Sequence, residues 1–110
     1  MNSEQPIARG AAASAVPDAP APGAVRIVLH PIPSPDSRTY IVAVGQDLRL
    51  WFTENFANRI GRMTPKGEVV GEYLIEGPNV GARAIIAHPN GRLYFSAHDA
   101  GAIGEVIPGR

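Results

Sequence analysis

Short apolar and β-branched runs, separated by turn signals, make up the chain from residue 25 onward. They predict strands, because no window shows an apolar repeat of 3.6 residues long enough for a helix. Two turns, Pro65-Lys66-Gly67 and Pro89-Asn90-Gly91, each place glycine where a hairpin loop needs a positive φ. The continuous apolar run 40–44 is typical of a strand buried on both faces. The expected strands are 25–31, 40–44, 48–53, 58–63 and 68–75, with three more from about residue 83 onward.

This pattern repeats after 43 residues without a gap. A period of about 40–45 residues with about four short strands in each unit is typical of the blades of a β-propeller. A β-sandwich, with a strand every 8–12 residues or so, is the structural alternative. The matches are Arg49-Leu50 with Arg92-Leu93, Trp51-Phe52 with Tyr94-Phe95, Ala57 with Ala100, Ile60-Gly61 with Ile103-Gly104, and Pro65 with Pro108.

The order of the expected strands gives the domain organisation. The first full unit covers about 39–76, and the second begins near 83 and stops at its third strand. The strand at 25–31 is of the outer type that the second unit lacks. The fold class is therefore all-β, and residues 25–110 form a partial propeller of about two four-stranded antiparallel blades. Because two blades leave both flat faces open, we expect self-association or a complementary propeller chain.

The first 24 residues differ in composition from the rest. Alanine, proline, glycine and serine account for nearly all of residues 10–24, which carry too little large apolar surface to offset the entropy of ordering. Residues 1–24 are therefore predicted to be a flexible N-terminal arm. Ala13-Ser14-Ala15 has the form of a signal-peptide cleavage site, but no apolar segment precedes it, so a cytoplasmic location is favoured over export.

Composition excludes several classes of function. Among 110 residues, ten basic side chains balance ten acidic ones, and this gives no electrostatic footprint for nucleic acid or for a membrane surface. Cysteine is absent, so neither a disulfide framework nor a thiolate zinc site is expected. There is also no glycine-rich phosphate loop and no nucleophile elbow.

The segment 50–67, LWFTENFANRIGRMTPKG, closely resembles the blade motif of the virginiamycin B lyases, also called streptogramin B lyases. The following EYLI at 72–75 is similar to the next strand of that family, and LYFS at 93–96 with AIG at 102–104 is a weaker second copy. The resemblance covers about residues 25–108. The motif is specific to this propeller superfamily but not to the lyase activity, because related sensor and scaffold propellers carry similar blades.

The resemblance implies a seven-bladed propeller that linearises cyclic streptogramin B antibiotics by elimination at the ester bond. It also implies a divalent metal, normally Mg²⁺, held by histidine and glutamate near the propeller centre, with a second histidine as acid or base. Such a cation polarises the ester and stabilises the developing enolate charge. The acid or base must lie within hydrogen-bond reach of the α-proton and titrate near pH 7.

This chain departs from that pattern at its catalytic positions. The family's histidine lies about eleven residues before the aromatic residue of the second strand, where this chain has Tyr40 and Arg83. The glutamate of the blade motif is present as Glu54, but its position in the second copy is Ala97. His98, one residue later, falls where a metal-binding glutamate can occur. The resemblance thus leaves open whether the chain is an enzyme.

Each candidate site residue also has an ordinary structural interpretation. Glu54 and His98 are candidate metal ligands, and His98 and Arg83 are candidate catalytic groups. Glu54 can instead pair with the backbone, with Arg59 or with Arg62. His98, beside Asp99, can be a solvated loop residue, although an imidazole next to a carboxylate can also hold a metal or act as a base. Arg83 can line an unfilled channel or bind an anion. The other two histidines, His30 and His88, are expected to be structural.

Three functional interpretations follow. The first is a virginiamycin B lyase-like repeat protein that is truncated and not catalytic alone. The second is a non-enzymatic module that assembles with itself, three or four copies giving six or eight blades, and binds a ligand or protein at its hub. The third is a competent lyase subunit that assembles Glu54, His98 and Arg83 across copies, with Mg²⁺ if the family chemistry is retained.

Overall fold

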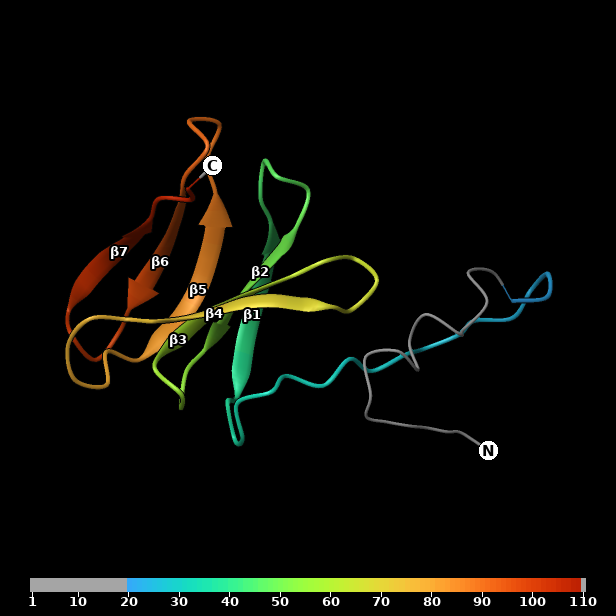
Figure 1. Ribbon diagram of the computed structural model, residues 1–110, viewed down its shortest axis with the longest axis horizontal. Coiled ribbons are helices and arrows are strands. Elements are labelled where there is room, and N and C mark those ends of the chain that lie inside the picture. The colour runs from blue at the N-terminus through green and yellow to red at the C-terminus, as the bar shows by residue number, and fades with distance from the viewer. Residues whose placement is uncertain (1–19, 110) are drawn as a thin grey trace.

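The computed structural model describes residues 20–109, which form two antiparallel β-sheets (Figure 1). Most of the expected N-terminal arm, residues 1–19, lies outside the described residues. Within 20–109 the chain forms no helix, and so has none of the length and apolar character needed to cross a membrane. The strands are β1 (Thr39–Val44), β2 (Leu50–Glu54), β3 (Arg59–Met63), β4 (Val69–Leu74), β5 (Ala82–Ala87), β6 (Leu93–Ala97) and β7 (Ala102–Val106).

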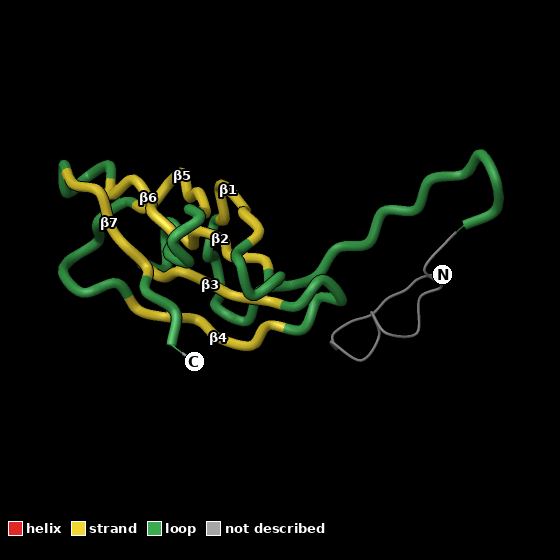
Figure 2. The backbone as a smooth tube through the Cα atoms, turned by 90° about the horizontal axis from the view of Figure 1, so that it is seen from above, coloured by secondary structure: helices red, strands yellow, loops and turns green. Residues whose placement is uncertain are grey.

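Each sheet is a meander of consecutive strands. The first sheet has the order β1-β2-β3-β4 and the second has the order β5-β6-β7. A sandwich would exchange strands between its sheets through Greek-key connections. The all-β class and the blade organisation predicted from the sequence are therefore confirmed, with one four-stranded and one three-stranded blade. Their first strands, β1 and β5, lie side by side (Figure 2).

The 43-residue period extends to the details of the backbone. Both first strands carry an irregularity at the same place, between Thr39 and Val42 in β1 and between Ala82 and Ile85 in β5. At each irregularity a side-chain hydroxyl group accepts a hydrogen bond from the backbone. The amide of Ile41 donates to Thr53 Oγ1, and the amide of Ala84 donates to Ser96 Oγ. The repeat in the sequence is thus a repeat of one hydrogen-bonded unit.

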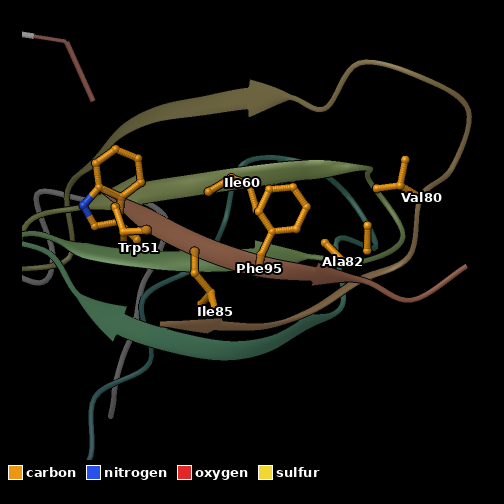
Figure 3. Close-up of a cluster of buried hydrophobic side chains, with 8 residues drawn as sticks. Trp51, Ile60, Val80, Ala82, Ile85 and Phe95 are labelled. Atoms are coloured by element: carbon orange, nitrogen blue, oxygen red, sulfur yellow. The ribbon is translucent and has the colours of Figure 1, made fainter. Parts of the chain in front are cut away.

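The hydrophobic core lies between the two sheets (Figure 3). Trp51 and Ile60 come from the first sheet, and Ile85 and Phe95 come from the second. Burying each of these side chains contributes about 1.5–3 kcal/mol to folding. The remaining buried members are Val80, Ala82, Leu93 and Ala97.

The expected outer strand at 25–31 is not formed. This segment runs away from both sheets (Figure 1), and its apolar side chains Val25, Ile27 and Leu29 are between 84% and 89% exposed. The pattern of β-branched residues predicts an extended segment, but a strand also needs a neighbour with which to exchange backbone hydrogen bonds. Segment 25–31 pairs with neither open edge, β4 or β7, so residues 20–109 form seven strands rather than the eight expected.

The prediction that residues 40–44 are buried on both faces is also wrong. Only Ala43 packs against the core between the sheets, while Val42 and Val44 on the other face are exposed. No other sheet within the described part of the chain faces that outer side of the first sheet. That side is covered in part by the linker 32–38, in which Ser34 and Ser37 are buried.

Candidate functional site

Tyr40 and Arg83, which stand where the resemblance places histidine, face each other across the two sheets. Tyr40 lies on β1 and Arg83 on β5, and the guanidinium carbon of Arg83 is 5.8 Å from the centroid of the Tyr40 ring. This is a cation–π contact between two exposed side chains. It places a fixed positive charge and a phenol at the two positions that would have to supply an imidazole.

Glu54 is fully buried at the end of β2. Neither of its carboxylate oxygens has a hydrogen-bond partner within residues 20–109. The expected pairing with an arginine is not found, because Arg59 donates to Ser34 Oγ (2.7 Å) and Arg62 donates to the Tyr73 hydroxyl group (2.6 Å). A buried, unpaired carboxylate is costly, so the group is expected to hold a proton.

A second glutamate, Glu72 on β4, accounts for the state of Glu54. Burial, with the neighbouring Glu72 carboxylate as the next cause, raises the pKa of Glu54 to about 8. Burial also acts to raise the pKa of Glu72, but the Ser34 hydroxyl group, Glu54 and the Arg59 guanidinium outweigh it and leave that pKa below its usual value. The pair therefore carries one proton and one negative charge at neutral pH.

Sequence reasoning missed this pair, although one signal for it was present. Gly61 on β3 lies opposite Glu72 on β4, and a Cβ atom at Gly61 would be 2.7 Å from Glu54 Oε2. The glycine therefore leaves the space that the Glu54 carboxyl group occupies between the strands. Spacing alone could not show it, because the register of three strands brings these residues together.

His98 lies in the exposed turn after β6. Its Nδ1 is 2.9 Å from Asp99 Oδ1, and its amide donates to the carbonyl of Gly81. The described residues contain no group of three or more His, Cys, Asp or Glu side chains that could hold a metal ion. Glu54, buried beside Glu72 and Arg59, and His98, in an exposed turn, therefore do not fit the magnesium site that the resemblance implies.

The other two histidines have structural surroundings. His30 packs against the turn between β3 and β4, where a Cβ atom on Gly67 would be 2.0 Å from its Nδ1. His88 Nδ1 accepts from the amide of Asn90 (3.0 Å), and its ring meets Tyr94 edge-on. The His30 contact lies at the turn between β3 and β4, and the His88 contacts lie at the turn between β5 and β6.

Residues 21–109 match the family model of the Virginiamycin B lyase family. The chain belongs to this family. It is 38% identical over 45 residues to the virginiamycin B lyase of Bacillus licheniformis, a stretch that covers 41% of this chain and 15% of that protein. This family member therefore spans only a part of the length of its curated relative.

Solved structures of virginiamycin B lyases share the fold of this family member. A streptogramin B lyase structure superimposes with a TM-score of 0.59 at 30% identity, covering 74% of this chain and 30% of that chain. A catalytically inactive variant of the virginiamycin B lyase from Staphylococcus aureus with quinupristin superimposes with a TM-score of 0.58 at 30% identity, covering 72% and 30%. The propeller-blade assignment is confirmed, and the chain spans about a third of these lyases.

Proposed function

We propose that the two blades of this virginiamycin B lyase-like chain have a scaffolding role and do not catalyse elimination on their own. The Tyr40–Arg83 contact carries this proposal. A general base for α-proton removal works best with a pKa near the operating pH. A guanidinium carries only N–H donors and no proton acceptor, and a phenol offers one oxygen where an imidazole offers two ring nitrogens. Neither side chain replaces the imidazole that the family resemblance implies at these positions.

The test is an assay for linearisation of a cyclic streptogramin B by the purified chain with and without Mg²⁺. Mass spectrometry would follow the linear product, with the Staphylococcus aureus lyase as positive control. We expect no linear product above the protein-free rate, and the same result for His98→Ala. Magnesium-dependent linearisation that His98→Ala abolishes would overturn the proposal in favour of a lyase assembled across copies.

A second candidate function is binding without turnover at the propeller hub. The observation that favours it is that Arg83 and Tyr40 are exposed together on the first strands of the two sheets. A guanidinium stacked on an aromatic ring suits an anionic or aromatic ligand. Calorimetric titration with quinupristin should show binding that Arg83→Ala weakens about tenfold, whereas equal binding by both forms would exclude this site.

A further inference from the structure

Several pairs of equivalent side chains in the 43-residue repeat differ sharply in burial. Ile60 on the first sheet is 3% exposed because it packs against the second sheet, but its equivalent Ile103 on β7 is 73% exposed. Trp51 is buried in the same contact, and its equivalent Tyr94 is only partly covered. The outer face of the second sheet therefore carries the same positions through which the first sheet packs against the second sheet.

The reverse holds on the first sheet. Ile85 on β5 is 2% exposed because it packs against the first sheet, whereas its equivalent Val42 on β1 is 59% exposed. Val44 beside it is exposed as well. Both sides of the sheet-to-sheet interface therefore occur twice in the chain. One set is joined between the two sheets. The other set lies on the opposite outer faces of the two sheets, where Val42 and Ile103 are exposed.

One hydrogen bond that joins the two sheets is donated by a hydroxyl group, and the second sheet carries an equivalent hydroxyl group. Thr53 Oγ1 accepts from the amide of Ile41 and donates across the interface to the carbonyl of Arg83 (2.9 Å). Ser96 is the equivalent residue of the second sheet, and its Oγ accepts from the amide of Ala84 in the same way. One repeat back from Arg83 is Tyr40, so the Ser96 hydroxyl group suits the Tyr40 carbonyl of another copy.

The linker 32–38 repeats the geometry of the linker 75–81. The amide of Asn55 donates to the carbonyl of Arg38 (3.2 Å), as the amide of His98 donates to the carbonyl of Gly81 (3.0 Å). Arg38 and Gly81 also share a positive φ, with values of 55° and 70°. Because the linker 75–81 follows the outer strand β4, segment 25–31 holds the place of an outer strand.

We propose that a second copy of this chain docks its β5–β6–β7 sheet onto the outer face of the β1–β4 sheet, and that its β7 edge pairs with segment 25–31 as a fourth strand. The interface between the two sheets of one chain is the template for this contact. The association is head-to-tail. Each copy contacts one neighbour through the outer face of its first sheet, which carries Val42, and another neighbour through the outer face of its second sheet, which carries Ile103. A ring closes once the blades number about four to eight.

Light scattering after size exclusion tests the proposal with the full 110-residue chain at about 100 µM. We expect a closed oligomer. We also expect Ile103→Lys or Val42→Lys to raise the dissociation constant about 100-fold, because each places an ammonium group in a contact that gives it no partner. Leu48→Lys is the matched control, since Leu48 is 74% exposed but lies in the turn between β1 and β2. A monomeric wild-type chain, or equal dissociation by the control, would overturn the proposal.

Mixing the two lysine variants distinguishes head-to-tail from face-to-face association. A head-to-tail contact leaves one intact face on each variant, so equal amounts of Ile103→Lys and Val42→Lys should form a heterodimer although each alone is monomeric. A mixture that stays monomeric overturns the docking geometry. Hydrogen exchange tests the strand: amides in 26–30 should exchange at least about tenfold more slowly in the wild-type oligomer than in Ile103→Lys. Equal rates would exclude strand pairing.

Discussion

The two sheets are built on one backbone plan, yet they differ in what surrounds them. Both have the same strand irregularity, the same hydroxyl cap and the same glycine in the third strand. In the first sheet the side chains Trp51 and Ile60 face the second sheet and are buried. In the second sheet the equivalent Tyr94 and Ile103 face no other sheet formed by residues 20–109. The repeat therefore specifies the shape of each blade, and the neighbours of each blade decide which faces contribute to stability.

The largest expected difference is between the two equivalent isoleucines. Ile60→Ala should lower the free energy of unfolding by about 2–4 kcal/mol, because it removes buried methyl groups and leaves a cavity in the core. Ile103→Ala should change it by less than about 0.5 kcal/mol, because a mostly exposed side chain loses little by truncation. Urea unfolding in the Val42→Lys background, which blocks the proposed association, provides the comparison. Similar losses at both positions would show that Ile103 is buried in the isolated chain.

The second comparison concerns the glycines that face an aromatic ring. A Cβ atom on Gly61 would be 2.2 Å from the Phe52 ring, and one on Gly104 would be 2.1 Å from the Phe95 ring. Overpacking of this kind costs about 1–3 kcal/mol. Gly104→Ala should lie at the upper end, because Phe95 belongs to the core between the sheets, whereas Phe52 is buried but lies outside that core.

Thermal unfolding of both alanine variants would measure these losses. Gly109→Ala is a suitable control, since nothing lies within 4 Å of a Cβ atom built there. A larger loss at Gly61 than at Gly104 would mean that the surroundings of Phe52 are more rigid than the core around Phe95.

The sequence was enough for the seven strands from β1 to β7, because local patterns and the repeat specify them. The turns at Gly67 and Gly91 have the positive φ that was predicted for them. Segment 25–31 has an equally strong strand pattern but forms no strand, since pairing depends on a neighbouring edge that no local pattern contains. Glu54 shows the same limit at the candidate site: its position in the motif was evident, but its partner Glu72 was set by the register of β2, β3 and β4.

The third comparison concerns Glu54, which can ionise, whereas its equivalent in the second sheet, Ala97, cannot. The pKa of Glu54 lies well above its unfolded value of 4.5, at about 8, so the folded state binds more protons than the unfolded state between these values. Stability should therefore fall as pH rises from about 4.5 to about 8 and level off above that range. The lowered pKa of Glu72 acts in the opposite sense, and its contribution is lost only as pH falls below its unfolded value of 4.5.

Glu54→Gln removes the ionisation while keeping the shape of the side chain. It should stabilise the chain by about 1–2 kcal/mol at pH 8.5 relative to wild type and by much less near pH 5, as measured by denaturant midpoints at both pH values. Glu76→Gln, an exposed control, should leave the pH dependence unchanged. Wild-type stability that rises between pH 5 and pH 8 would contradict a protonated Glu54.

The smallest expected effect concerns the turns between the first two strands of each sheet. Leu48 has a φ of 63°, and its equivalent in the second sheet is Gly91, with a φ of 90°. A side chain in this left-handed region costs about 1–2 kcal/mol, whereas glycine adopts it freely but loses more entropy on folding. Leu48→Gly should therefore raise the free energy of unfolding by about 0.5–1 kcal/mol in denaturant titrations. Gly91→Leu should lower it by a similar amount, and an unchanged stability in both variants would show that this turn relaxes to fit either residue.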